Sequence, residues 1–330
     1  MMREETHPAA PLPALGDRLR ERLRGFQGLG PLVALVVLVV LLSVSTSSFL
    51  TVPNLMNVLQ QSSVTLIMAL GMTVVIISAG IDLSVGSVLA LSGCTAALLA
   101  TRADLPVAVC IVAALLVGVL CGIVSGLTIA LTRIPDFIMT LGMLSAIRGL
   151  ALILTRGLPV TGLPRPLTFL GSTRIGGVVP VSVAVAAAMT VLVWFILNYT
   201  ATGRCAFAVG GNREAARASG INLTRHTTAV YALSGFLAGV AAIVTLGRIN
   251  SANALMGQGA ELSVIAVVII GGTNLFGGQG SISGTVLGAL IFGVISNGLN
   301  LRNVTAFWQQ LFVGVLIILV AVVNQLRHRS

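Results

Sequence analysis

Runs of apolar residues, each long enough to cross a membrane, recur along almost the whole chain and restrict its fold more than any other feature. A helix of about 20 residues spans the hydrocarbon core of a bilayer. Only 8% of the residues are charged, whereas a typical soluble domain has about 25%. We expect apolar spans at 31–50, 56–79, 84–101, 106–131, 136–155, 179–199, 227–247, 261–276, 282–300 and 305–325. The sequence therefore predicts an all-α polytopic membrane protein with about ten transmembrane helices.

Arginine sets the predicted orientation. The net charge is +10 and the chain contains no lysine. Basic proteins bind nucleic acids or anionic membrane surfaces, but here the arginines follow the positive-inside rule, with twelve in the inner segments and six in the outer ones. We expect cytoplasmic tails at 1–30 and 326–330 around a permease domain at 31–325, with no nucleic-acid partner. The arginines before the first apolar run resemble the basic start of a signal peptide. The apolar run itself, however, is close to full spanning length, which favours an uncleaved first span.

The composition also argues against enzyme chemistry. Without lysine there is no G-x-x-x-x-G-K-[ST] loop for nucleotide phosphates and no Schiff-base nucleophile. The four cysteines lack C-x-x-C spacing, and the three histidines lie outside the apolar runs. The predicted spans contain no paired carboxylates and no Ser–His–Asp arrangement. We therefore expect a chain that is not an enzyme and that holds no cofactor or metal of its own.

Two connections between the spans are long. Residues 156–178 contain several prolines and glycines and are expected to form an outer loop with little regular structure. Residues 200–226 are expected on the inner side. Small residues at Gly118–Gly122–Gly126 and Gly284–Gly288 are typical of close helix packing in membranes.

The chain also contains an internal echo. Residues 62–87, "SSVTLIMALGMTVVIISAGIDLSVGS", resemble residues 259–281, "GAELSVIAVVIIGGTNLFGGQGS". Each stretch leads an apolar helix into a glycine-punctuated polar break. Two such breaks at corresponding positions indicate discontinuous helices along a transport path, although two apolar, glycine-rich stretches also resemble each other by chance. Our span assignment gives both copies the same orientation.

Polar side chains within or beside the spans are candidates for that path. Asp82 adjoins two apolar runs, where an ionisable group is costly unless it faces protein, water or a partner. It is predicted to cap a helix that begins at Leu83, with Ser84 and Ser87 assisting, or to act as a gate; substrate contact and proton relay are the alternatives. Each of the other candidates also fits a simple interhelical hydrogen bond. The tentative path or gate residues are Asn57, Gln60, Gln61, Asp82, Ser84, Asn274 and Asn297.

Residues 210–221, "GGNREAARASGI", form a polar island in the inner loop. Asn212 is a favoured N-cap, Glu214 suits the positive end of a helix and Arg217 the negative end, and Gly220 suits a left-handed stop. The pattern predicts a helix of about two turns, too short to be stable alone in water. It must pack on its own bundle or dock in a groove of a cytoplasmic partner.

Three motifs resemble the permease subunits of ribose-type (monosaccharide) ABC importers. They are "GMTVVIISAGIDLSVGSVLAL", "GRCAFAVGGNREAARASGI" and "GGTNLFGGQGSISGTVLGALIFGVISNGL", and the resemblance covers residues 30–325. It implies the ten-helix importer fold and a signature between two early spans at Gly80, Asp82, Leu83, Ser84, Gly86 and Ser87. It also implies an ATPase-coupling helix at Gly211, Asn212, Glu214, Ala215, Ala216, Arg217, Ser219, Gly220 and Ile221.

The same resemblance implies the partners and the function. A second permease subunit, identical or paralogous, would complete the membrane unit. A cytoplasmic tandem-domain ATPase would bind ATP and Mg²⁺, and a periplasmic or extracellular protein would deliver the sugar. The chain would then import a pentose, hexose or related small polyol across the bacterial inner membrane by alternating access. A stand-alone secondary transporter or channel is the alternative, and it would not need the cytoplasmic helix.

Overall fold

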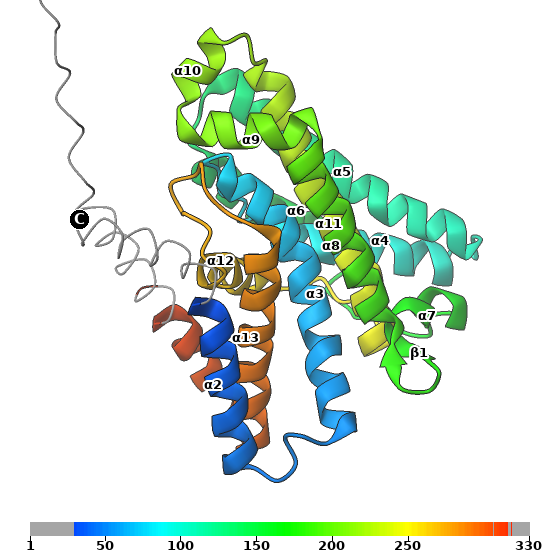
Figure 1. Cartoon of the computed structure of the whole chain (residues 1–330). Helices are drawn as coiled ribbons and strands as arrows, with labels where there is room; N and C mark the ends of the chain where they lie inside the picture. The colour runs from blue at the N-terminus through cyan, green and yellow to red at the C-terminus, as the bar shows by residue number, and fades with distance from the viewer. Residues whose placement is uncertain (1–29, 306, 316–317, 319–330) are drawn as a thin grey trace, which may run out of the picture.

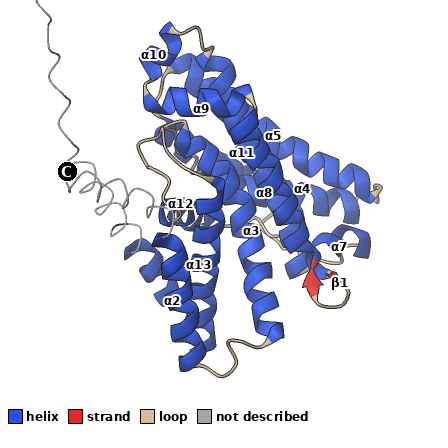
Figure 2. Ribbon diagram, viewed as in Figure 1, coloured by secondary structure: helices blue, strands red, loops and turns tan. Residues whose placement is uncertain are grey.

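The computed structural model describes residues 30–305, 307–315 and 318, and these residues fold almost entirely into helices (Figures 1 and 2). The predicted tails at 1–30 and 326–330 lie outside the described residues except for Gly30, as does part of the last predicted span. The helices are α2 (Gly30–Ser45), α3 (Val52–Ile77), α4 (Val85–Thr101), α5 (Val107–Thr132), α6 (Asp136–Thr155), α7 (Arg165–Ser172), α8 (Val181–Tyr199), α9 (Ala201–Gly211), α10 (Arg213–Ala218), α11 (Leu223–Ile249), α12 (Ala260–Ile270) and α13 (Ile282–Leu301).

Six of these helices are long and apolar enough to cross a membrane: α3, α5, α6, α8, α11 and α13. Three shorter apolar helices, α2, α4 and α12, occupy other predicted spans. The chain is therefore an all-α polytopic membrane protein. Six of its described helices have full spanning length, and some of the predicted spans hold shorter helices than expected. The largest shortfall is at 261–276, where the 11-residue α12 ends at Ile270 because Gly271 and the left-handed Gly272, with a φ of 88°, end the helix.

The outer connection at 156–178 is more ordered than the prediction of little regular structure. Its prolines begin a helix, because Pro164 is the N-cap of α7 and Pro166 occupies its first turn, where the missing N–H is not needed. The strands β1 (Arg174–Ile175) and β2 (Val179–Pro180) then pair as an antiparallel hairpin. Proline content alone therefore gave the wrong expectation for this segment.

The centre of the bundle is α11, which packs along α5 at very short range. A Cβ atom added at Gly118 would overlap the carbonyl oxygen of Gly235, and one added at Gly122 would overlap that of Tyr231. Gly284 and Gly288 bring α13 equally close to the backbone of α12. The predicted close packing at both small-residue motifs is confirmed.

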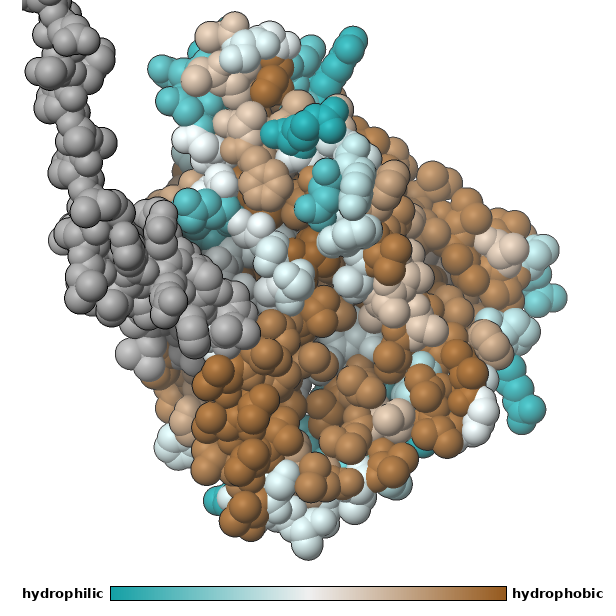
Figure 3. All heavy atoms as spheres, in the orientation of Figure 1, coloured by the Kyte–Doolittle hydropathy of each residue, from teal (hydrophilic) through white to brown (hydrophobic). Residues whose placement is uncertain are grey.

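The polarity of the surface follows the same plan. Apolar side chains cover the faces of the long helices, and hydrophilic side chains gather at the end that carries α9 and α10 (Figure 3). On α5, for example, Leu116, Leu120 and Leu131 are exposed. Such an exterior suits surrounding lipid around the spans and water around α9 and α10.

Candidate functional site

The polar island folds as predicted, into a short capped helix. The Asn212 side chain accepts hydrogen bonds from the backbone N–H groups of Glu214 and Ala215, at 3.0 and 2.9 Å. The helix α10 has Glu214 in its first turn and Arg217 in its last. Gly220 then takes a φ of 85°, the left-handed conformation expected of a helix stop. Local capping rules therefore account for both ends of α10.

Helix α9, which leads into α10, was not expected from the sequence, and it connects α10 to the bundle. A Cβ atom at Gly210 would overlap the carbonyl oxygen of Ile77, the last residue of α3, and would lie 2.6 Å from the amide nitrogen of Gly278. The Gly278 N–H donates a 2.9 Å hydrogen bond to that same Ile77 oxygen. At the start of α11, the His226 Nε2 atom lies 3.2 Å from the Ser78 hydroxyl. The polar end of the molecule thus touches both glycine-rich breaks.

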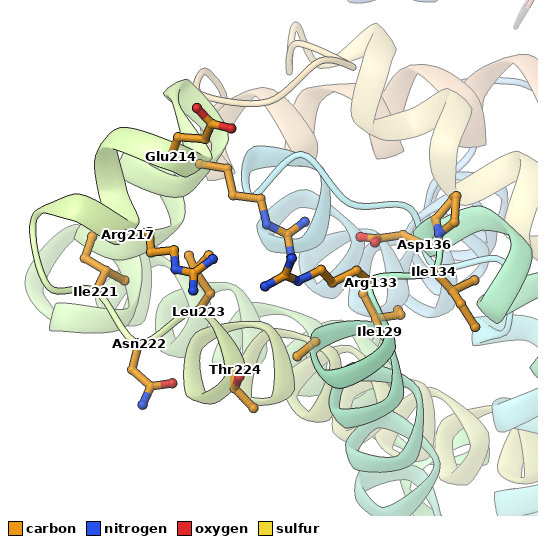
Figure 4. A pocket seen from close by; sticks show the side chains of 13 residues that line it. Ile129, Arg133, Ile134, Asp136, Glu214, Arg217, Ile221, Asn222, Leu223 and Thr224 are labelled. Carbon is orange, nitrogen blue, oxygen red and sulfur yellow. The ribbon is translucent and has the colours of Figure 1, made fainter.

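A charged cavity of about 520 Å³ separates α10 from the loop between α5 and α6. Its charged lining residues are Arg133, Arg213 and Arg217 together with Asp136 and Glu214. The side chains of Arg133 and Arg217 extend into it from opposite walls (Figure 4). This face of the protein is therefore a recessed surface with an excess of positive charge.

The first break, residues 78–84, is held by Asp82, which is only 2% exposed. One carboxylate oxygen accepts hydrogen bonds from the Ser84 N–H and hydroxyl at 3.0 and 2.6 Å. The other accepts a 2.8 Å bond from the Ser234 hydroxyl of α11. Asp82 therefore caps the turn before α4 and ties it to α11. The prediction of a helix starting at Leu83 was wrong, because this turn delays the helix to Val85.

The second break, residues 271–281, is shaped by its own side chains and by contact with the first break. The Asn274 side chain accepts a 3.0 Å hydrogen bond from the Phe276 N–H, and Ser281 caps α13 through the Gly284 N–H at 3.1 Å. Gly277, with a φ of 90°, lies so close to Ala79 that an added Cβ would come within 2.7 Å of the Ala79 Cβ. The two halves of the internal echo therefore pack side by side, although some 200 residues separate them in sequence.

A second cavity, of about 260 Å³, lies between the membrane helices. It lies at the middle of α3 and α13 and reaches the end of α11 that is remote from α10. Its lining residues are Gln61, Ser62, Val64, Thr65, Met68, Leu89, Thr245, Arg248, Gly257, Ala260, Phe292, Gly293, Ser296 and Gln309. The wall is therefore a mixture of amide, hydroxyl and apolar side chains with one guanidinium group and, among the described residues, no carboxylate.

Of the predicted path residues, Gln61 alone lines this cavity. The neighbouring Gln60 points elsewhere and donates a 2.7 Å hydrogen bond to the Gly171 carbonyl of α7. Asn297 forms a reciprocal amide pair with Asn54, at 3.0 and 2.9 Å, which joins α3 to α13. Asn57 is exposed. The remaining candidates, Asp82, Ser84 and Asn274, lie in the two breaks, so the structure does not bring the predicted path residues together.

Sequence reasoning missed most of the cavity wall. Gln61 and Thr65 are four residues apart on α3, and Phe292 and Ser296 are four apart on α13. Residues with this spacing share one face of a helix. A search for polar residues at helical spacing inside the apolar runs would have found them.

A family model described as "Branched-chain amino acid transport system / permease component" matches residues 54–321. The chain belongs to this permease family. The permease is 43% identical over 296 residues to the ribose import permease protein of Escherichia coli (strain K12), covering 89% of the chain and 92% of the relative. It is 36% identical over 317 residues to the fructose import permease protein of Rhizobium meliloti, covering 94% and 88%.

A third relative of the permease is the D-allose transport system permease protein of Escherichia coli (strain K12), 36% identical over 292 residues, or 88% of the chain and 89% of the relative. No solved structure is a significant match to the chain. The resemblance to monosaccharide ABC importer permeases, stated above from three motifs, is confirmed. These relatives are named as transport proteins, which agrees with the expectation that the chain is not an enzyme.

Proposed function

We propose that this permease is the membrane subunit of an ATP-driven importer that moves a monosaccharide into the cytoplasm. Ribose, fructose and allose permeases all align with nearly the whole chain at 36–43% identity, which supports a small sugar as the substrate. The substrate is a pentose, a hexose or a related polyol. The cavity of about 260 Å³ among the spans is of a size suited to one such molecule.

The observation that carries the proposal is the position of α10. This helix has only six residues, far below the roughly 12–15 that are marginally stable alone in water, and it stands at the hydrophilic end of the molecule (Figures 1 and 3). Ala216 is its one buried residue, so most of its side chains are free to contact another protein. We assign α10 as the coupling helix that docks in a groove of a cytoplasmic tandem-domain ATPase.

The contacts of α9 provide a route from that ATPase to the spans. ATP and Mg²⁺ bind to the partner, and closure of its nucleotide domains moves α10. Because α9 meets α10 at Asn212 and touches Ile77 and Gly278 through Gly210, the motion reaches both breaks together. Two breaks that shift together switch the surrounding helices between outward-facing and inward-facing states.

The remaining parts of the importer follow from this assignment. Nine apolar helices are described: α2, α3, α4, α5, α6, α8, α11, α12 and α13. The apolar sequence at 305–325, which lies partly outside the described residues, is the tenth predicted span. Both termini and α10 then lie in the cytoplasm and the hairpin β1–β2 lies outside. A second permease subunit completes the pathway, and an external binding protein delivers the sugar.

Reconstitution tests the proposal directly. The permease, its ATPase and its binding protein are placed in proteoliposomes, and uptake of labelled D-ribose, D-fructose and D-allose is measured with ATP or with a non-hydrolysable analogue. We expect uptake of at least one sugar that requires ATP hydrolysis and is reduced by Glu214→Arg in α10. Uptake that persists without the ATPase would instead identify a stand-alone secondary transporter or channel and would refute the proposal.

A further inference from the structure

The membrane cavity is lined by polar groups that have no partner inside the protein. Gln61, Thr65, Arg248 and Ser296 line it, and their side chains make no hydrogen bond or ion pair with another described residue. The Ser62 hydroxyl beside them is buried and also unpartnered among the described residues. Polar groups left unpaired at membrane depth are costly. Gln61, Thr65, Arg248 and Ser296 are therefore available to bind another molecule in the cavity.

Several polar side chains elsewhere in the spans are paired, in contrast to the four that line this cavity. Gln60 bonds to a backbone carbonyl of α7, and Asn54 pairs with Asn297. Thr73 bonds to the Ala69 carbonyl and lies 2.7 Å from the Thr285 hydroxyl. Ser92, Ser182, Thr228, Glu261 and Thr273 also have a buried oxygen without a partner among the described residues. Those atoms are scattered, whereas four unpaired polar side chains share the wall of this one cavity, and that shared wall indicates a ligand site.

The chemistry of the wall selects the ligand class. Amides and hydroxyls both donate and accept hydrogen bonds, as do the hydroxyl groups of a sugar. The described lining contains no carboxylate to bind a cation. Met68, Leu89 and Phe292 supply apolar surface for the C–H faces of a sugar ring. The combination suits a small, neutral, polyhydroxylated molecule better than an ion or an apolar solute.

The position of the cavity is suited to holding a substrate part-way across the membrane. Thr65 lies at the middle of α3, and Arg248 lies near the end of α11 remote from α10. Gly257 and Ala260, from the start of α12, also line it. The backbone before α12 is held by Arg148, which donates hydrogen bonds to the carbonyls of Ala254 and Met256. The cavity therefore extends from the outer side to the middle of the bundle.

We propose that this cavity is a substrate site within a single permease subunit. It holds a neutral monosaccharide through hydrogen bonds from Gln61, Thr65, Arg248 and Ser296 on its way across the membrane. The proposal rests on the proposed function and deepens it by assigning the residues that the sugar contacts. It also assigns the polar contacts to α3, α11 and α13 rather than to the two breaks.

Transport by the assembled complex provides the first test. Thr65→Val and Ser296→Ala remove one hydroxyl each, and Thr190→Val on α8 is the matched control, since Thr190 bonds within its own helix and does not line the cavity. We expect the two cavity variants to reduce uptake about three- to tenfold each, the effect of one lost hydrogen bond. The Thr190→Val control keeps the uptake rate and the basal ATP hydrolysis of the unmodified complex.

A binding readout separates this proposal from the importer proposal. In a background where Cys94, Cys110, Cys121 and Cys205 are replaced by alanine, the thiol of S296C is alkylated with N-ethylmaleimide with or without D-ribose, D-fructose or D-allose. We expect at least one sugar to slow the alkylation of S296C and none to slow that of T190C. This assay needs no ATP.

The outcomes distinguish the two ideas. Protection of S296C in a complex that transports no sugar with ATP would refute the importer proposal and support the site. ATP-driven uptake with equal rates for the cavity variants and Thr190→Val, and without protection of S296C, would overturn the site and leave the importer proposal standing. If Thr65→Val does not fold, Ser296→Ala and the alkylation assay decide the question.

Discussion

Replacing Gly210 by alanine tests whether α9 transmits motion through direct backbone contact. The added Cβ would overlap the carbonyl oxygen of Ile77 and lie 2.6 Å from the Gly278 nitrogen. Both atoms belong to the backbone and to the hydrogen bond that joins the second break to the end of α3, so neither rotates away as a side chain would. The substitution therefore forces α9 away from the breaks.

The expected cost follows from three effects. Overpacking typically costs about 1–3 kcal/mol, and a backbone obstacle places Gly210→Ala near the upper end. Loss of the Gly278–Ile77 hydrogen bond adds about 1 kcal/mol. The greater helix propensity of alanine recovers about 0.5–1 kcal/mol. We expect a net destabilisation of about 3 kcal/mol, from the overpacking estimate and these two corrections.

The neighbouring glycine provides the control. A Cβ added at Gly211 has no atom within 4 Å beyond its own chain neighbours, so Gly211→Ala should be neutral or slightly stabilising. Thermal unfolding in detergent, followed by tryptophan fluorescence, compares the two variants, and the assembled importer gives the number of sugar molecules moved per ATP. We expect Gly210→Ala to lower both the melting temperature and the number of sugar molecules moved per ATP. Equal melting temperatures and equal transport ratios for the two variants would refute the contact as a coupling element.

Three further substitutions test the polar contacts. Asn212→Ala should destabilise α10 by about 1 kcal/mol through loss of its cap and weaken ATPase binding, whereas Asn212→Asp should preserve binding; an alanine variant that binds normally would contradict this role. Asn54→Leu should cost about 1–3 kcal/mol in thermal unfolding because it leaves the Asn297 amide unpaired, and the Asn54→Leu/Asn297→Leu double variant should recover part of that loss rather than add to it. Asp82→Ala should lower the melting temperature more than Asp82→Asn, since asparagine keeps one oxygen for Ser84; the reverse order would contradict a structural role for this carboxylate.

Features set by local chemistry could be predicted from the sequence. The start of α10 at Asn212 and its stop before Gly220 depend on caps within a few residues, and the structure has both. The class of the fold follows from apolar runs that few soluble proteins contain. The two polar breaks are also visible as glycine-rich interruptions, because a left-handed backbone at positions such as Gly272 favours glycine.

Features set by distant contacts could not be predicted in the same way. Helix α9 has no side-chain cap at Thr200, and its glycines Gly203 and Gly210 disfavour a helix. Backbone contacts with the end of α8 and with the two breaks compensate for that weak propensity. Nothing in a local window reveals those contacts.

Side-chain pairing has the same limit, and Gln60 and Gln61 illustrate it. The two residues are identical and adjacent, yet one is bonded to α7 and the other faces the membrane cavity without a described partner. Residue type predicts that each is costly in a membrane, but not which of them finds a partner. That depends on where α7 packs against α3, a contact between segments more than 100 residues apart.

The two similar stretches, 62–87 and 259–281, lie in contact in the structure, and this contact would make their breaks move together. The Gly278 N–H of the second break bonds directly to the carbonyl of Ile77, the residue before the first break, and Gly210 of α9 lies against both groups. Contacts between backbones are stiffer than contacts through long side chains, because no side-chain rotation absorbs a displacement. A force on α9 would therefore move α3 and the segment before α13 by comparable amounts. Since both helices also line the membrane cavity, the same displacement would change the width of that cavity, which links a movement at α10 to the release of a molecule held between them.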